Sequence, residues 1–104
     1  MRPVPPRPLV SVVIPVFNEQ AVLPELLRRL GALFAAQPAC DWEAVLVDDG
    51  SRDRSAELIR EEARRDPRFR LVELTRNFGF QAALAAGLSR ARGDAIVTMD
   101  ADLQ

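Results

Sequence analysis

The run Leu9-Val10-Ser11-Val12-Val13-Ile14 is almost continuously apolar and rich in β-branched residues. Runs of this kind are typical of a strand covered on both faces, because a half-exposed strand alternates apolar and polar residues. Pro15 follows directly, and proline lacks the backbone N–H that a central strand uses. The run therefore predicts a buried strand of a parallel sheet that ends near Pro15.

Helix and strand patterns alternate outward from this first strand. Pro24 suits the first turn of a helix, so the helix that follows is expected to begin near it. Asp53 or Ser51 can cap the next helix, which should end before Pro67. In chain order the predicted elements are a helix over 23–34, a strand over 42–47, a helix to about 66, a strand over 70–74, a helix over 80–91 and a strand over 95–99.

This alternation predicts one α/β domain with a mostly parallel sheet, right-handed crossovers and helices on both faces. The third strand alternates more than the others, which places it nearer a sheet edge. We expect Gly87 to permit close packing of the third helix and Gly93 to cap its C-terminus. Residues 1–8, rich in Pro and Arg, are predicted to be a disordered tail, and residues 9–104 the domain.

The composition excludes several kinds of chemistry within this chain. All 14 basic residues among the 104 are Arg, and there is no Lys or His. A Schiff-base lysine, a P-loop lysine and a Ser-His or Cys-His pair are therefore absent. The formal net charge of -1 gives no electrostatic footprint for nucleic acid. The single Cys40 offers no disulfide framework and disfavours a zinc site.

Unusual polar clusters follow all four predicted strands. They cover residues 15–19, 48–53, 75–81 and 100–104. In open parallel sheets ligands bind beyond the carboxyl ends of the strands, and three of these clusters also open a helix, where anions are favoured. The clusters therefore predict a site at one rim of the sheet. For Asn18, Ser51 and Asp53, capping and ligand contact remain equal alternatives.

Asp100 and Asp102 flank Ala101 directly after the last predicted strand. In extended backbone, residues two apart project from the same face, roughly 6.5–7 Å apart. Two carboxylates directed one way repel each other unless a cation lies between them. Mg²⁺ uses one or two protein carboxylates together with water and substrate phosphates. The pair therefore suggests a metal site, and a surface turn is the alternative.

Competing fingerprints are missing from the sequence. No Gly-x-Gly-x-x-Gly motif follows the first predicted strand, which disfavours a dinucleotide-binding site. A phosphoacceptor receiver would place its acidic cluster after the first strand, whereas the carboxylates here follow the second and fourth. Taken together in order, four segments resemble the N-terminal half of a family 2 glycosyltransferase of the GT-A type: Ser11–Glu19, Val47–Asp53, Arg76–Ala83 and Gly93–Gln104.

The Arg76-Asn77-Phe78-Gly79 block followed by Asp100-Ala101-Asp102-Leu103-Gln104 is most similar to the polyprenyl-phosphate branch of that family, the dolichol-phosphate-mannose-synthase-like enzymes. This resemblance implies an inverting transfer of a sugar from a UDP- or GDP-linked donor to a polyprenyl phosphate. It implies a metal site for Mg²⁺ or Mn²⁺ formed by Asp100, Asp102 and Gln104. It implies a donor site formed by Pro15, Phe17, Glu19, Val47, Asp48, Asp49, Ser51, Arg76, Asp100 and Ala101.

Within that implied site some roles stay open. Phe17 occupies a position where many relatives have Tyr, so it can stack on a base without offering a hydroxyl. Adjacent strand residues face opposite ways, so only one of Asp48 and Asp49 should face the nucleotide. Arg76 either reaches the diphosphate or is solvated. No residue is assigned as a catalytic base, since a phosphate acceptor is already anionic.

Relatives in this family continue with acceptor-side residues and often with membrane segments. The resemblance therefore implies a domain truncated after Gln104, membrane contact through the missing part at the cytoplasmic face, and possible homo-oligomers. We expect 104 residues to form a nucleotide-binding half with an exposed edge at the fourth strand and little transfer activity alone. Two alternatives remain: a saccharide acceptor, or an inactive α/β fragment.

Overall fold

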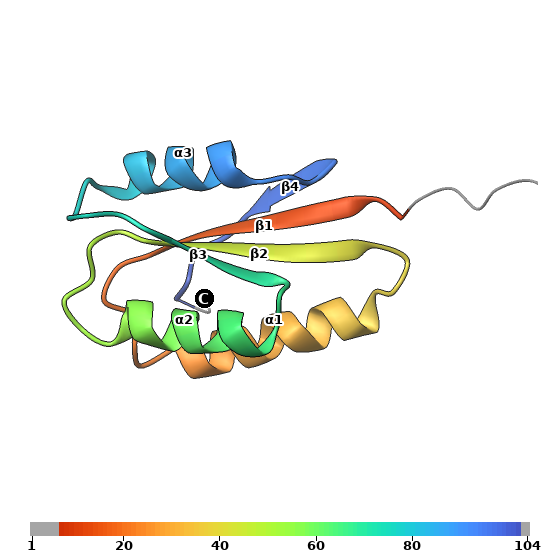
Figure 1. The fold of residues 1–104 in the computed structure, drawn as a ribbon, viewed down its shortest axis with the longest axis horizontal. Helices are drawn as coiled ribbons and strands as arrows, with labels where there is room; N and C mark the ends of the chain where they lie inside the picture. The colour runs from red at the N-terminus through yellow and green to blue at the C-terminus, as the bar shows by residue number, and fades with distance from the viewer. Residues whose placement is uncertain (1–6, 103–104) are drawn as a thin grey trace, which may run out of the picture.

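The computed structural model describes residues 7–102, so Gln104 and most of the predicted tail lie outside the described residues. Strands and helices alternate along the whole described chain (Figure 1). This confirms the predicted order of elements. The elements are β1 (Leu9–Val16), α1 (Leu23–Ala36), β2 (Asp41–Asp48), α2 (Ser55–Arg65), β3 (Phe69–Glu73), α3 (Phe80–Arg90) and β4 (Ala95–Thr98).

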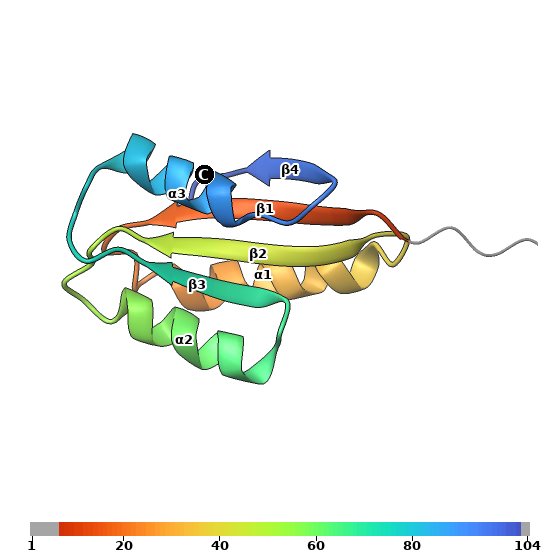
Figure 2. The same ribbon diagram turned by 45° about the horizontal axis from the view of Figure 1, so that its top comes forward.

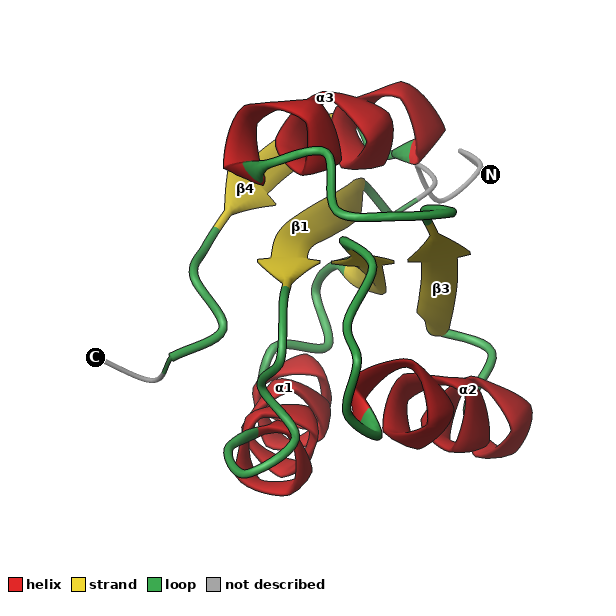
Figure 3. Ribbon diagram, turned by 90° about the vertical axis from the view of Figure 1, so that its left-hand side faces the viewer, coloured by secondary structure: helices red, strands yellow, loops and turns green. Residues whose placement is uncertain are grey.

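The four strands form one sheet in the order β3-β2-β1-β4, and every neighbouring pair is parallel (Figure 2). β1 and β2 are central, which explains why their sequences are nearly continuous apolar runs. α1 and α2 cover one face of the sheet and α3 covers the other (Figure 3). The α/β class, the helices on both faces and the edge position of the third strand are confirmed, and β4 lies at the other edge of the described sheet.

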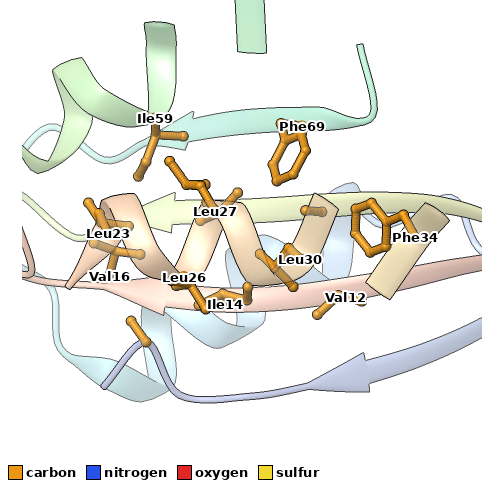
Figure 4. Packing of buried hydrophobic residues seen from close by; sticks show 13 residues of the cluster. Val12, Ile14, Val16, Leu23, Leu26, Leu27, Leu30, Phe34, Ile59 and Phe69 are labelled. Carbon is orange, nitrogen blue, oxygen red and sulfur yellow. The ribbon is translucent and has the colours of Figure 1, made fainter. Parts of the chain in front are cut away.

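The larger core lies between the sheet and the α1–α2 layer. Apolar residues at helical spacing place one face of α1 against alternate residues of β1. Burying each such side chain contributes about 1.5–3 kcal/mol relative to leaving it exposed. Figure 4 shows this packing, in which the labelled residues include Val12, Ile14, Val16, Leu23, Leu26, Leu27, Leu30, Phe34, Ile59 and Phe69.

A smaller core lies under α3, where Val13, Val45 and Val47 face Ala83. Gly87 of α3 allows close packing, as predicted, because a Cβ there would overlap the side chains of Val13 and Val47. The prediction for the second glycine is wrong.

Gly93 does not cap α3. That helix ends at Arg90, and the C-cap residue is Ala91, with an extended backbone at φ −68° and ψ 136°. A Cβ on Gly93 would instead lie 2.5 Å from Ser11 Oγ and 2.7 Å from Ser11 N. Gly93 is therefore required by the close approach of β1, a contact that the local sequence does not reveal.

Among residues 7–102, none of the helices is both long and apolar enough to cross a membrane.

Candidate functional site

A cleft of about 350 Å³ opens at the carboxyl ends of the strands. Its walls come from the ends of β1 and β2, the segment before α3 and the segment after β4, which the sheet order brings to one rim (Figure 2). The lining residues are Pro15, Val16, Phe17, Glu19, Asp49, Asn77, Gly79, Phe80, Asp100, Ala101 and Asp102.

Seven of the residues implied by the sequence resemblance line this cleft: Pro15, Phe17, Glu19, Asp49, Asp100, Ala101 and Asp102. Four others, Val47, Asp48, Ser51 and Arg76, do not line it, and Gln104 lies outside the described residues. Their ligand roles stay predictions. Among the lining residues not singled out from sequence is Asn77, whose signal was its place in the polar cluster after the third strand.

Asp48 and Asp49 face opposite sides of the sheet. Asp48 shares the face of Ala44 and Leu46, toward α1 and α2, whereas Asp49 lines the cleft. Asp48 Oδ2 accepts from the Ser51 N–H at 3.2 Å, and its buried Oδ1 has no hydrogen-bond partner within the described residues. The sequence leaves open which of the two carboxylates faces the site. In the structure, of these two, only Asp49 faces the cleft.

The Asp49 carboxylate, 3% exposed, holds the start of α3. Its Oδ1 accepts from the Phe78 N–H at 2.8 Å, and its Oδ2 accepts from the Gly79 N–H at 3.0 Å and from Asn77 Nδ2 at 3.2 Å. Gly79 has a φ of 99°, a conformation that side chains rarely adopt. Asp49 thus fixes the backbone of the wall that Asn77 and Gly79 contribute to the cleft.

Reciprocal hydrogen bonds join the loop after β1 to the loop after β2. Asn18, at φ 52°, donates its N–H to Ser51 Oγ at 2.8 Å and accepts from the Arg52 N–H through Oδ1 at 2.8 Å. Asp53 accepts from the N–H groups of Ser55 at 2.9 Å and Gln20 at 3.2 Å. The N-cap residue of α2 is Arg54, without a side-chain cap hydrogen bond, so neither Asp53 nor Ser51 occupies the predicted N-cap position. Asn18, Ser51 and Asp53 instead join the two loops and hold the wall of the cleft beside Phe17.

Hydrogen bonding also controls the charge of Asp53. Burial raises the pKa of Asp53, and the hydrogen bonds from Ser55 and from the Gln20 N–H outweigh that effect, so its pKa lies below the usual value. The carboxylate is therefore ionised at neutral pH, and its hydrogen bonds with the two N–H groups are charge-assisted.

The segment after β4 is anchored by its middle residue. Ala101 is 4% exposed and belongs to the core on the α1 face, while Asp100 and Asp102 on either side are exposed and line the cleft. The small side chain in the middle therefore acts as a buried anchor. Both flanking carboxylates are delivered to the same cleft by this arrangement.

Carboxylate oxygens suit a hard divalent cation that takes its other ligands from phosphates and water. Asp100 and Asp102 meet that requirement in their chemistry, and Glu19 and Asp49 add negative charge to the same cleft. Within residues 7–102 no group of three His, Cys, Asp or Glu side chains is arranged to hold a metal ion without a substrate. The two carboxylates thus fit a divalent cation whose coordination shell substrate phosphates would complete.

Arg76 lies outside this cleft. Its guanidinium stacks 4.1 Å from the centroid of the Phe78 ring, and it lines a second hollow of about 410 Å³ with Arg52. Phe17 and Asn77 separate the two hollows, since both line each of them.

Known proteins resemble this chain closely. An undecaprenyl-phosphate 4-deoxy-4-formamido-L-arabinose transferase of Pseudomonas aeruginosa (strain LESB58) is 56% identical over 100 residues, which are 95% of this chain and 29% of the relative. The uncharacterized glycosyltransferase YkcC of Bacillus subtilis (strain 168) is 46% identical over 94 residues, covering 90% of this chain and 29% of that protein. This chain therefore spans about three tenths of the length of these relatives.

Solved structures show the same fold. The mannosyltransferase PcManGT of Pyrobaculum calidifontis, in complex with GDP-Man and Mn²⁺, has a TM-score of 0.79 and 33% identity, covering 92% of this chain and 28% of that one. S. aureus TarS 1-349, in complex with UDP-GlcNAc, has a TM-score of 0.77 and 28% identity, covering 89% of this chain and 26% of that one. The predicted GT-A fold is confirmed by these likenesses.

The family model described as "Glycosyl transferase family 2" matches residues 11–104, from the middle of β1 through the acidic segment after β4. The predicted resemblance is confirmed, and the chain belongs to glycosyl transferase family 2.

Proposed function

We propose that this chain is the donor-binding part of an enzyme that transfers a sugar from a UDP- or GDP-linked donor to a polyprenyl phosphate. The observation that carries the proposal is the cleft at the carboxyl rim, where Phe17, Glu19 and Asp49 meet the carboxylates of Asp100 and Asp102. The similarity to an undecaprenyl-phosphate sugar transferase and to a GDP-Man complex supports the acceptor and donor classes.

Each wall of the cleft offers a different part of the donor a partner. Phe17 is 44% exposed and presents an aromatic face on which a nucleobase can stack. Glu19, on the same loop, can accept hydrogen bonds from ribose hydroxyls. Asp49 holds the opposite wall, including Asn77, in place. Phe17 and Glu19 would therefore orient the nucleoside, and Asp49 would keep the pocket preformed.

The diphosphate would lie beside Asp100 and Asp102, which with Gln104 would hold Mg²⁺ or Mn²⁺. When bound, the cation supplies Lewis-acid stabilisation of the charge that develops on the leaving diphosphate. Ala101 keeps both carboxylates on the cleft side through its burial in the core. Without a cation the four carboxylates of this lining would repel an anionic donor.

The acceptor needs little help with deprotonation, because a polyprenyl phosphate is anionic at neutral pH. One of its oxygens would form a bond to the anomeric carbon on the face opposite the departing diphosphate, which would leave with the electron pair of the broken C–O bond. The configuration at the anomeric carbon would therefore be inverted. We place this reaction at the cytoplasmic face of a membrane, where polyprenyl phosphate would be presented.

Isothermal calorimetry with UDP- and GDP-sugars, with and without Mn²⁺, tests the proposal. We expect Mn²⁺-dependent binding of at least one donor, and we expect Asp102→Ala to abolish the dependence on Mn²⁺. Glu57→Gln, a change in an exposed ion pair on α2, is the matched control and should bind as the wild type. Absence of Mn²⁺-dependent binding for every donor would refute the donor site.

The acceptor class needs a second measurement. A radiolabelled sugar donor is incubated with a polyprenyl phosphate or with a saccharide in the presence of Mn²⁺ and the full-length enzyme. Label that partitions into organic solvent supports the lipid acceptor. Label that stays in water as an extended saccharide supports the alternative acceptor.

A further inference from the structure

β4 carries the acidic segment, yet its own sequence specifies its position weakly. It has four residues, pairs within the described part of the chain only with β1, and all four side chains are exposed. The register of a strand is strongly specified only where one face is buried, and a slip by one residue turns every side chain to the other face. A slip of β4 would therefore turn Asp100 and Asp102 away from the cleft.

A buried carboxylate at the opposite end of the sheet contacts the chain just before β4. Glu43 of β2 is 6% exposed, and its Oε2 accepts from the Arg92 N–H at 2.7 Å and from Ser11 Oγ at 2.5 Å. Ser11 Oγ in turn accepts from the Gly93 N–H at 2.8 Å. Because the hydroxyl hydrogen of Ser11 is donated to Glu43, its lone pairs are directed to Gly93. Two successive amides before β4 are thus bound by β2 and β1.

The same contact excludes other registers by its shape. A Cβ at position 93 would lie 2.5 Å from Ser11 Oγ, so only glycine fits in contact with the Ser11 side chain. Shifting β4 by one residue in either direction would bring Arg92 or Asp94 to that place. Asp94 adds a further restraint, because its Oδ2 accepts from the Leu9 N–H at 2.9 Å while its own N–H donates to Leu9 O at 2.7 Å.

The carboxylate itself is held by a cation. Arg70 Nη1 donates to Glu43 Oε1 at 2.7 Å and to the carbonyl oxygen of Arg90, the last residue of α3, at 2.9 Å. The turn between α3 and β4 is therefore fixed at its beginning by Arg70 and at its end by Ser11.

We propose that Glu43 is a positioning residue for the carboxylates of Asp100 and Asp102. It acts from the far end of the sheet, by fixing the register of β4 on β1 through Ser11 and the amides of residues 92–93. At the near end, the Met99 N–H donates to Val13 O at 3.1 Å, so a correctly started strand delivers the acidic segment to the cleft. The positioning role rests on the proposed use of Asp100 and Asp102 as cation ligands.

The test separates the binding of nucleotide from its enhancement by the cation. UDP and GDP binding to Glu43→Gln is measured by calorimetry with and without Mn²⁺. Substitution of residues that orient metal ligands typically lowers metal affinity by 10–100-fold. We therefore expect the enhancement of nucleotide binding by Mn²⁺ to fall about 10-fold or more. Binding without Mn²⁺ should stay at the wild-type value, because Phe17 and Asp49 are untouched. A merely structural role would weaken both or neither.

Glu73→Gln is the matched control, since Glu73 is a β3 carboxylate that pairs with Arg60 at 2.7 Å and does not touch β4. It should keep the full Mn²⁺ enhancement. Full enhancement in Glu43→Gln, or equal losses with and without Mn²⁺, would overturn the positioning role. Should Glu43→Gln fail to fold, Ser11→Ala removes only the hydroxyl beside Gly93 and must show the same selective loss.

Hydrogen exchange gives a readout that needs no ligand. In Glu43→Gln the amides of residues 96–99 should exchange faster, while those of β2 and β3 keep their protection. If the wild type shows no Mn²⁺-enhanced binding, the proposed function fails. Unchanged exchange over residues 96–99 overturns the register inference by itself, so the two failures are distinguishable.

Discussion

β2 carries a buried carboxylate near each end, Glu43 close to its start and Asp49 just after its last residue. Both accept hydrogen bonds from backbone N–H groups of segments that flank α3: Asp49 from residues 78–79 before the helix, and Glu43 from Arg92 after it. The same device therefore fixes both ends of the crossover between β3 and β4.

The two carboxylates differ in how their charge is balanced. Glu43 forms an ion pair with Arg70 at 2.7 Å, whereas Asp49 has no ion pair within residues 7–102 and is balanced only by N–H and amide donors. Asp49 also lines a cleft whose described lining has four carboxylates and no basic side chain. The ion pair neutralises the charge at the start of β2, whereas the uncompensated carboxylate at its end leaves negative potential in the cleft where we propose that a cation binds.

The largest expected effect is the difference between the same isosteric change at two adjacent buried aspartates, Asp49 and Asp48. Asp49→Asn replaces one carboxylate oxygen by an amide donor, which faces the N–H of Phe78 or that of Gly79 according to the orientation of the amide. Leaving that part-buried donor unsatisfied and removing the charge should lower the free energy of unfolding by about 3 kcal/mol. Asp48→Asn should cost less than about 1 kcal/mol, because its Oδ1 has no partner among the described residues to lose. Urea denaturation of both variants measures the difference, and equal costs would refute the distinction between them.

Removing the positive charge of Arg70, which pairs with Glu43 near the start of β2, should have a smaller effect. Arg70→Met leaves Glu43 with its Ser11 and Arg92 donors but without its ion pair, so we expect a loss of about 2 kcal/mol in the free energy of unfolding. Arg60→Met breaks an exposed pair and should cost about 0.5 kcal/mol or less. Thermal and urea unfolding compare the two variants. A similar cost for both would mean that the Arg70–Glu43 pair stabilises the fold no more than an exposed ion pair does.

Much of this molecule follows from its sequence. Continuous apolar runs indicate central strands, and in the described sheet β1 and β2 are central. Polar clusters after strands indicate a rim, because the carboxyl ends of parallel strands meet at one edge, and the cleft lies there. Both patterns can be recognised in the sequence, because the burial of a strand sets its composition and the chain order sets where polar residues follow a strand.

Long-range contacts account for what the sequence could not predict. Gly93 follows a helix and reads as a cap, yet the approach of Ser11 decides its role. Arg76 follows a strand at the rim, but its position over Phe78 depends on a loop shaped by Asp49. Ala101 is expected from the sequence only as part of the implied donor site, and its burial depends on the core beneath α1. Each of these outcomes is set by residues distant in sequence.

The smallest expected effect is the dependence of stability on acid. Burial raises the pKa of Glu43, but the hydrogen bonds from Arg92, Ser11 and Arg70 outweigh it and hold the pKa below 4.5. A lowered folded-state pKa means that the stabilising contribution is complete above the unfolded value, near 4.5, and is lost as the pH falls through the folded-state value.

The free energy of unfolding of the wild type should therefore decline below pH 4.5, and that of Glu43→Gln should decline less steeply over the same range. Asp53 and Asp66, whose pKa values are also lowered, remain in both proteins and cancel in the comparison. Urea titrations at a series of pH values measure the two slopes. Equal slopes would mean that the charge of Glu43 does not contribute to the free energy of unfolding, and that the shape of the Gly93 contact alone holds β4.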